Sequence, residues 1–542
     1  MTPRVTMLDC TLRDGGYYTN WDFSRPLVSA YLRAVSAAGV GAMELGFRSL
    51  PQERFNGPFA YSSDEFLRTL PLPQGVQLGV MVNAKELTAH PAGPEAAIDA
   101  LFQEAASSPI TLVRVAGYLQ ELARYEPITH RLKARGYTVA INLMQASLAS
   151  PAALTHAADR IRRWKSVDLL YLADSLGNMS PSMVQERLKG LRAAWPGPLG
   201  LHAHNNMEQA VANCLAAIEV GATWIDGTLL GMGRGAGNAQ TEHLLVALKD
   251  LGLGSYVPEA VFQLVMEEFD PLKRQHGWGA SLLYYLSGTY GIHPTYVQEM
   301  LGRRQYDVHH ILEALEFLKR SGAAVYSDDT LEQAMAPPEG PADGAWSAQG
   351  WARGRPVLIV ARGSGMRQHL EALCQYTEAR DPLVVCLNAN REFPAERVSA
   401  YAACHKMRML LDLEEYRSLN RPLIAPLGAV PEVVRERFGQ FGTLSVLDYG
   451  MRVVPGVFEV RPNGCTIPAY LVAAYVLALA EAGGASQILL AGFDGYEPTD
   501  PRQLEMAQTF RCYQARPTAV PLLAVTPTTY HIPKGSIYSP VL

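Results

Sequence analysis

The feature that most constrains the fold is a regular alternation of short apolar runs with amphipathic helical segments over residues 5–227. Eight runs have the pattern of buried strands: residues 5–8, 42–45, 77–81, 111–115, 138–143, 169–173, 199–203 and 223–227. Helical patterns lie between them, for example at residues 27–38, 151–163, 181–194 and 207–220. Eight such strand–helix units predict a TIM barrel of the α/β class, in which functional groups lie at the C-terminal ends of the strands.

Polar side chains follow or end several of these predicted strands. They are Asp14 after the first strand, Glu44 on the second, Arg114 on the fourth, Asn142 on the fifth, and His202 and His204 on the seventh. Because the carboxyl ends of barrel strands meet at one rim, we expect these side chains to share a single site.

The pair His202 and His204 is the strongest local signal at this rim. Side chains at i and i+2 of a strand point to the same face, so both imidazoles face the same way. Two imidazoles with the carboxylate of Asp14 can hold a divalent metal and leave positions open for substrate. The ligand types alone fit a non-haem Fe(II) site equally well. The alternative without a metal is that both histidines have a structural role and only make hydrogen bonds within the core.

Composition limits the partners and the compartment. A chain of 542 residues exceeds one ordinary core, and its net charge of -5 has no long run of one sign, which disfavours nucleic acid and anionic membranes. The 7 cysteines contain no C-x-x-C, as expected in a reducing cytoplasm. The first strand begins too early to leave room for a signal peptide, and the apolar run at 467–482 is interrupted by Pro468, which predicts a buried helix and no membrane insertion.

The pattern divides the chain into four parts. We expect a barrel over 1–250, a helical extension over 251–335, a Pro/Gly-rich linker over 336–354 and a second domain over 355–542. Predicted strands of the second domain are 357–361, 383–387, 409–413, 423–426, 444–447 and 488–491. Their alternation with helices predicts a Rossmann-like, doubly wound sheet.

The motif at 8–16, Leu-Asp-Cys-Thr-Leu-Arg-Asp-Gly-Gly, together with Leu-His-Ala-His-Asn at 201–205, resembles a metal-dependent TIM-barrel superfamily. That superfamily includes HMG-CoA lyase, isopropylmalate synthase and 4-hydroxy-2-oxovalerate aldolase. The resemblance implies that Asp14, His202 and His204 are metal ligands, that Asn238 lies at or near the metal, and that Arg13 stabilises an enolate. It implies Mn²⁺ or Mg²⁺, with Zn²⁺ also compatible, and the barrel with Arg13 argues against Fe(II).

The chemistry implied by the resemblance accounts for these residue types. Cleaving a C–C bond beside a 2-oxo acid leaves an enolate, on which a divalent cation acts as a Lewis acid. A fixed guanidinium adds a second positive partner with directed donors. The substrates would be small molecules, a 2-oxo acid such as pyruvate and an aldehyde, and the enzyme a lyase.

Differences within the superfamily favour the aldolase branch. Gly16 and Tyr17 follow the Arg-Asp-Gly motif, where acyl-CoA-condensing relatives have an acidic residue and Gln. The Gly-rich loop at 231–238 lacks the Cys of HMG-CoA lyase and is closest to the 4-hydroxy-2-oxovalerate aldolase pattern. An acyl-CoA-dependent condensing enzyme or lyase stays as the enzyme alternative, and a non-catalytic binding protein on a barrel scaffold as the alternative of another class.

The acid/base group departs from that pattern. Related aldolases carry a His three positions after the ligand Asp, and this chain has Tyr17 there. A phenol with a pKa of about 10 needs help to act as a base, so Tyr17, Tyr18 or a water on the metal are the candidates. Glu44 either supports the metal site or is a buried barrel acid.

The remaining substrate-binding candidates are weaker. Arg114 and Asn142 lie on predicted strands that lead to the rim, and Tyr285, beside Tyr284, lies where related aldolases place a substrate-side tyrosine. The loop at 231–236 also fits G-x-G-x-x-[GA], but it follows the last barrel strand, so a tight loop near the metal is favoured over a dinucleotide site.

The second domain opens with a strand, a Gly/Ser turn and a helix, a shape that suits a phosphate. It loosely resembles Rossmann-like domains of the sialyltransferase type, which implies a nucleotide or nucleotide-sugar site with Gly363, Ser364 and Asp494. A scaffold or oligomerisation domain is the alternative, and a homo-oligomer is compatible with the sequence. The combined hypothesis is a pyruvate-type aldolase that uses a sugar-derived aldehyde in making an unusual surface polysaccharide.

Overall fold

The computed structural model describes residues 4–302, 308–336, 341–430, 435, 445–497 and 500–539, and the chain forms two compact units. The first unit comprises Met1–Glu299 with Leu318–Thr330, and the second comprises Met300–Phe317 with Leu331–Leu542. Helices α15 (Pro294–Gly302), α16 (Val308–Ser321) and α17 (Asp328–Met335) each contain residues of both units.

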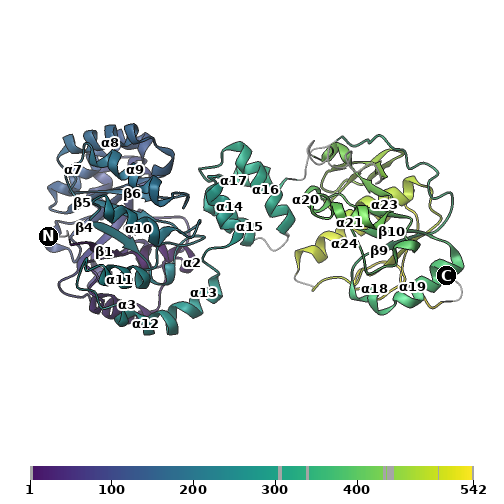
Figure 1. The fold of residues 1–542 in the computed structure, drawn as a ribbon, viewed down its shortest axis with the longest axis horizontal. Coiled ribbons are helices and arrows are strands. Elements are labelled where there is room, and N and C mark those ends of the chain that lie inside the picture. The colour runs from purple at the N-terminus through teal and green to yellow at the C-terminus, as the bar shows by residue number, and fades with distance from the viewer. Residues whose placement is uncertain are drawn as a thin grey trace. The chain divides into compact units, whose positions relative to one another are not determined.

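The first unit contains the expected closed barrel of eight parallel strands, paired in chain order with β8 against β1 (Figure 1). The strands are β1 (Thr6–Asp9), β2 (Ala42–Phe47), β3 (Gln77–Asn83), β4 (Leu112–Tyr118), β5 (Thr138–Met144), β6 (Leu169–Asp174), β7 (Leu199–Ala203) and β8 (Trp224–Gly227). Every strand predicted for the barrel is present, with ends shifted by at most a few residues. The TIM-barrel prediction is confirmed.

Helices cover the barrel and extend beyond it. They are α1 (Thr11–Asp14), α2 (Gly16–Thr19), α3 (Arg25–Ala37), α4 (Asp64–Leu67), α5 (Ala84–Thr88), α6 (Pro94–Leu101), α7 (Glu126–Ala134), α8 (Pro151–Trp164), α9 (Pro181–Arg192), α10 (Ala210–Glu219), α11 (Thr241–Asp250), α12 (Glu259–Leu264), α13 (Asp270–His276) and α14 (Leu282–Thr289). Three of the longest begin at Ser with Pro one or two residues later, and Ser24, Ser150 and Ser180 each accept a backbone N–H of the first turn. These serines fix where the helices start. The Ser side chain accepts a backbone N–H that has no partner within the helix, and Pro has no N–H that would need a partner.

Two different environments lie on the two faces of the barrel wall. Outward-facing aliphatic side chains pack against the helices in one continuous core. Inside, a small apolar cluster contains Leu8, Cys10, Leu112 and Tyr171. Charged side chains are also buried inside the barrel, among them Glu44.

The segment after the barrel covers its C-terminal rim. Asn206 Nδ2, after β7, donates to Ser287 Oγ of α14 at 3.1 Å. Gln145 Nε2, after β5, donates to the carbonyl of Ala324 at 2.7 Å. Trp278 Nε1 donates to the carbonyl of Leu230, after β8, at 3.0 Å. The part of the helical extension that belongs to the first unit therefore forms a cap over the strand ends where the polar residues were expected.

The second unit contains a seven-stranded parallel sheet in the order β13-β12-β11-β10-β9-β17-β18. Its strands are β9 (Val357–Val360), β10 (Leu383–Leu387), β11 (Ala400–Ala402), β12 (Leu423–Ala425), β13 (Val446–Asp448), β17 (Ile488–Ala491) and β18 (Leu522–Ala524). Alternate residues of each strand enter one of two hydrophobic clusters, for example Ile359 and Leu358. The sheet is thus covered on both faces. The strand order reverses at β9, because β10 to β13 lie on one side of it and β17 and β18 lie on the other.

Parts of this unit differ from the sequence-based expectation. The parallel sheet is present, but its order is not the six-strand Rossmann order, so the Rossmann-like assignment is not confirmed. The strand predicted at 409–413 is wrong: α20 (Lys406–Leu411) and α21 (Leu413–Leu419) occupy that segment. Met, Leu, Lys and Arg are strong helix formers, and this propensity outweighs the apolar character of the run. The strand that lies between β10 and β12 is instead the three-residue β11.

The described part of the second unit also contains a three-stranded sheet and further helices. They are β14 (Gly450–Val453), β15 (Glu459–Arg461), β16 (Gly464–Ile467), α18 (Ser364–Gln368), α19 (Leu370–Arg380), α23 (Val472–Ala482) and α24 (Pro501–Gln514). The apolar helix α23 lies inside the core. No helix among the described residues is long and apolar enough to span a membrane.

The segment expected as a linker, 336–354, is only partly described, because residues 337–340 lie outside the described residues. From residue 341 on it packs into the second unit. The N–H of Gly344 donates to the carbonyl of Asn463, the N–H of Trp346 donates to the carbonyl of Asp448, and Ala348 is buried in the core.

Candidate active site

The junction of β1 and α1 places two charged residues on the barrel rim. The Asp9 carboxylate accepts the N–H of Thr11 at 2.9 Å and the hydroxyl of Tyr31 at 2.6 Å, which fixes the chain as it leaves the strand. Residues 11–14 then form a single helical turn, with Arg13 and Asp14 both buried.

Asp14 lies at the centre of the site. Asn238 Nδ2 donates to Asp14 Oδ2 at 2.9 Å, and His202 Nε2 lies 3.4 Å from the same oxygen. Arg13 Nη1 donates to Asp14 Oδ1. Burial alone would raise the pKa of this carboxyl, but Arg13, with His202 and His204, holds the pKa below its ordinary value. Asp14 is therefore an anion at neutral pH, as a metal ligand must be.

Each histidine is oriented through its Nδ1 atom. His202 Nδ1 lies 2.9 Å from Asp226 Oδ2, and His204 Nδ1 lies 2.7 Å from the carbonyl oxygen of Asp174. Since both partners accept, Nδ1 carries the proton in each ring and the lone pair is on Nε2. Burial lowers the pKa of His204 to about 3, so its ring is neutral at working pH.

The donor atoms fit a divalent cation. His202 Nε2 and Asn238 Oδ1 are buried, and neither has a hydrogen-bond partner among the described residues. Ligand atoms of Cys10, Asp14 and His202 lie within 4.8 Å of one another, and the rings of His202 and His204 are 5.0 Å apart between centroids. Orphaned nitrogen and oxygen atoms around a carboxylate suit a cation that takes mixed N and O ligands.

Cys10 belongs to this cluster and sequence reasoning missed it. Its thiol lies 3.6 Å from Asp14 Oδ2 and 3.5 Å from the carbonyl of Gly227. Burial, with the nearby Asp14 carboxylate, raises the pKa of Cys10 well above its ordinary value, so the thiol stays protonated and is a poor ligand. Its spacing of four residues before Asp14 was the one available signal.

Arg13 offers one free donor to the site. Its Nε donates to Glu44 Oε2 at 2.7 Å and its Nη1 to Asp14. Its Nη2 is buried and has no hydrogen-bond partner. The guanidinium is thus held by two carboxylates, and its remaining N–H groups can bind an anionic oxygen.

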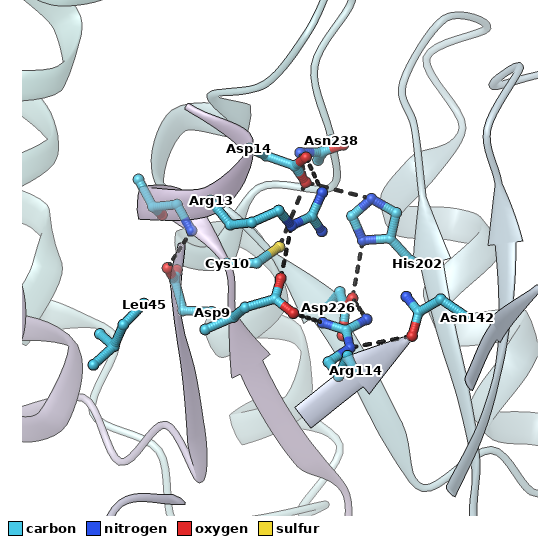
Figure 2. A network of polar contacts seen from close by, with 12 residues as sticks. Asp9, Cys10, Arg13, Asp14, Leu45, Arg114, Asn142, His202, Asp226 and Asn238 are labelled. Atoms are coloured by element: carbon cyan, nitrogen blue, oxygen red, sulfur yellow. Dashed lines mark hydrogen bonds and ion pairs between the residues drawn. The ribbon is translucent and has the colours of Figure 1, made fainter. Parts of the chain in front are cut away.

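A closed circuit of charged groups supports this arrangement (Figure 2). Glu44 lies between Arg13 and Arg114, with Arg114 Nη1 at 3.3 Å from Glu44 Oε1. Arg114 Nη2 lies 2.5 Å from Asp226 Oδ2, the oxygen that also faces His202. Paired charges can be buried in this way, whereas breaking one pair leaves an uncompensated charge. The circuit fixes Arg13 and His202 on opposite sides of Asp14.

Two substrate-binding expectations change with this geometry. Arg114 is 0% exposed, over the ring of Tyr171, so it supports the site from below and is not available to substrate. Asn142 Oδ1 accepts from Arg114 Nε at 3.2 Å and is therefore already engaged. Both residues face the barrel interior as expected, but at a level beneath the rim.

The expected tyrosines lie in different environments, and their roles stay predictions. Tyr285 is 43% exposed, whereas Tyr284, its neighbour on α14, is 3% exposed. Adjacent helical residues point about 100° apart, and it is Tyr284 whose ring lies against Gly235 of the Gly-rich loop. Tyr17 is half-exposed and packs edge-on against Trp21, so it lies at the mouth of the site, and its acid/base role stays a prediction.

In the second unit, the three expected residues come together. Asp494 Oδ2 accepts the hydroxyl of Ser364 at 2.7 Å and the N–H of Gly365 at 2.8 Å. The carboxylate therefore takes the place that a phosphate was expected to occupy at this turn. Gly363, Ser364 and Asp494 line a cavity of about 1000 Å³ at the carboxyl ends of β9 and β17.

Comparison with known proteins gives consistent matches. A family model described as HMGL-like matches residues 4–263. The chain is 31% identical over 328 residues to a 4-hydroxy-2-oxovalerate aldolase of Carboxydothermus hydrogenoformans, covering 59% of this chain and 94% of that relative. It is 32% identical over 248 residues to an oxaloacetate decarboxylase of Mycobacterium tuberculosis, covering 45% and 70%. It is 34% identical over 253 residues to 4-hydroxy-2-oxovalerate aldolase 2 of Rhodococcus jostii, covering 46% and 71%.

Proposed function

The chain belongs to the HMGL-like family, and from this membership and the rim geometry we propose that it is a divalent-metal-dependent aldolase. Its reaction would form or cleave the bond between C3 and C4 of a 4-hydroxy-2-oxo acid. Cleavage leaves the enolate of pyruvate and an aldehyde, so the enzyme is a lyase whose partners are small molecules.

The observation that carries this proposal is the free edge of the Arg13 guanidinium. Two carboxylates, Glu44 and Asp14, hold this side chain, and its Nη2 is buried without a partner beside the Asp14–His202 cluster. A preorganised donor of this kind stabilises charge that develops on a substrate oxygen. An enolate oxygen next to the proposed cation is such a charge.

The residues of this chain would divide the reaction as follows. In the direction of synthesis, C3 of pyruvate loses a proton to a base, for which Tyr17 at the mouth is our candidate. The Arg13 Nη2 group donates to the resulting enolate oxygen. C3 then attacks the aldehyde carbon, and the protonated base returns its proton to the new alkoxide to give the 4-hydroxyl group. Asp226 and the carbonyl of Asp174 hold the two imidazoles in place meanwhile.

Asp14, His202 and His204 would hold the cation, with Asn238 beside them. A divalent ion, when bound there, supplies Lewis acidity toward the carboxylate and keto oxygens of the 2-oxo acid. Carboxylate, amide and imidazole ligands suit Mn²⁺ or Mg²⁺, and Zn²⁺ also accepts them.

Substrate tests separate this proposal from its alternatives. The Mn²⁺-loaded protein is incubated with 4-hydroxy-2-oxovalerate, 4-hydroxy-2-oxoglutarate, oxaloacetate or HMG-CoA, and products are identified by mass spectrometry. The proposal predicts pyruvate together with an aldehyde from at least one of the first two. Pyruvate and CO₂ from oxaloacetate alone would make the protein a decarboxylase, and acetoacetate from HMG-CoA alone would make it an acyl-CoA lyase. Turnover of none would favour a binding protein.

We also propose that the second unit binds a nucleotide or nucleotide sugar in its cavity. The cavity lies where the strand order reverses, which is where open parallel sheets bind ligands. Because Asp494 occupies the turn at Ser364, a ligand phosphate would have to contact other donors of the wall, such as Arg362. A sugar-derived aldehyde and a role in surface-polysaccharide synthesis in the cytoplasm follow from this proposal.

Calorimetric titration of the full-length protein with UDP, CDP, CMP and their sugar conjugates tests this second part. Binding that is lost in Asn388→Ala, a change in the cavity wall, supports it. Absence of binding by every probe would leave the unit as a scaffold or assembly element.

A further inference from the structure

The loop after β8 carries a second arginine close to the site. Arg234 stands four residues before Asn238, the residue that donates to Asp14. The N–H of Gly237 donates to the Arg234 carbonyl at 3.1 Å, and the N–H of Gly279 donates to the Gly235 carbonyl at 3.1 Å. The loop backbone is thus tied both to itself and to the cap, so the position of Arg234 is fixed relative to the site.

The Arg234 guanidinium has no counter-ion among the described residues. It lies over the ring of Tyr17, 5.4 Å from the ring centroid, and its Nε is buried with no hydrogen-bond partner. Within the described part of the chain, no carboxylate lies within ion-pair distance of it. A partly buried cation without a partner is costly, and the cost falls when an anion binds.

Phenol groups surround this guanidinium. Tyr18 donates its hydroxyl to the Gly235 carbonyl at 3.4 Å. A Cβ at residue 235 would lie 2.9 Å from Tyr284 Cε1, and φ there is +64°, so only glycine lets the two pack so closely. Burial raises the pKa of Tyr18, Tyr118 and Tyr284, and the positive charge of Arg234 acts in the opposite direction on all three. The mouth therefore combines one cation with several hydroxyl groups.

The two arginines differ in depth. Arg13 contacts Asp14 directly and is 5% exposed. Arg234 makes no such contact and lies over Tyr17, which is 37% exposed at the mouth. Arg13 thus lies where it can bind the proposed enolate, and Arg234 lies where it can bind a second substrate beside the enolate.

We propose that Arg234 binds an anionic group of the aldehyde, so that the substrate class is an aldehyde carrying a carboxylate or a phosphate. This inference rests on the proposed aldolase function and specifies its second substrate. The phenols would then contact hydroxyl groups along the same aldehyde, as in a sugar acid or a sugar phosphate.

Matched pairs of aldehydes test the proposal. The Mn²⁺-loaded full-length protein is assayed with pyruvate and succinic semialdehyde or butanal, and with glyceraldehyde 3-phosphate or glyceraldehyde. The anionic member of at least one pair should have the higher kcat/KM, and the pair that shows it tells a carboxylate from a phosphate. Arg234→Gln should lower kcat/KM for that anionic aldehyde about 10- to 100-fold, the range for a lost charge-assisted hydrogen bond. It should change the value for the neutral member less than about twofold.

Controls separate this inference from the proposed function. Arg160→Gln, an exposed change on α8, should alter none of these values. Exchange of pyruvate methyl protons without aldehyde should stay intact in Arg234→Gln, as should its metal content. Equal use of both members of each pair, or a KM for pyruvate raised with every aldehyde, would overturn the assignment of Arg234. Absence of proton exchange in the wild type would instead overturn the aldolase proposal, and this inference with it.

Discussion

The two parallel sheets of this chain use their carboxyl edges differently. In the barrel, the strand ends converge, and inward side chains from β2, β4, β7 and β8 join Arg13 and Asp14 in one closed circuit of charges. In the open sheet of the second unit, a cavity lies at the edge between β9 and β17, and Asp494 caps the neighbouring turn. Closure lets distant strands build a reactive centre, whereas an open edge provides a place to bind.

The largest expected difference between the two units is in metal binding, which should depend on the barrel alone. His202→Ala removes one of the proposed ligands, so the Mn²⁺-loaded protein should lose its metal and its turnover should fall to background. Metal content is measured by elemental analysis on the folded protein. Asn388→Ala, in the cavity of the second unit, is the matched control and should keep its metal. Stoichiometric metal in His202→Ala, and likewise in Asp14→Ala, would show that the ligands are misassigned.

The next effect concerns the enolate donor. Arg13→Lys keeps the charge but loses the planar fork that donates to both Glu44 and Asp14. It should retain metal and lose about 10²-fold in kcat, as when an oxyanion donor is removed. Steady-state kinetics with a 4-hydroxy-2-oxo acid measure this. A rate within a few-fold of wild type would remove Arg13 from the mechanism.

A smaller effect on stability should also be confined to the barrel unit. Burial raises the pKa of Glu242 to about 7. Between its unfolded pKa, near 4.5, and 7, the folded state binds more protons than the unfolded state. The free energy of unfolding therefore falls as pH rises through this window, by about 3 kcal/mol in all. Glu242→Gln should flatten this slope in denaturant titrations at pH 5 and 8, and an unchanged slope would show that Glu242 titrates normally.

The smallest effect lies in the second unit. Asp494→Ala removes the acceptor of Ser364 and Gly365, which should destabilise that unit by about 1 kcal/mol. Pyruvate proton exchange should stay at the wild-type rate. Loss of exchange in this variant would mean that the two sheets do not divide the work as described.

The sequence indicated which residues lie together at the rim where its signals are local. Arg13 and Asp14 share one turn, His202 and His204 share one strand face, and each strand is long enough to show its pattern. The circuit through Asp226 could not be predicted, because it joins residues from strands far apart in the chain. Which of Tyr284 and Tyr285 is buried could not be predicted, because the phase of α14 against the rim depends on tertiary packing.

The second unit was harder to predict for related reasons. β11 and β18 have three residues each, too few to show a period. Segment 409–413 is apolar enough to be predicted as a strand, but Met and Leu are also strong helix formers, and helices α20 and α21 occupy it. Asp494 accepts the N–H of Gly365, although the two residues follow different strands of the sheet. The sequence therefore predicted a turn that could bind a phosphate, whereas the Asp494 carboxylate occupies that turn in the structure.

The most direct test of the account is exchange of pyruvate methyl protons in D₂O, without any aldehyde. The Mn²⁺-loaded protein is incubated with pyruvate, the metal is removed with EDTA, and the methyl signal is followed by proton NMR. The account predicts exchange by the wild type and by Asp494→Ala at equal rates, about 10²-fold slower exchange by Arg13→Lys, and none by His202→Ala. No exchange by the wild type, or equal exchange by all four proteins, would contradict the claim that the barrel rim stabilises the pyruvate enolate.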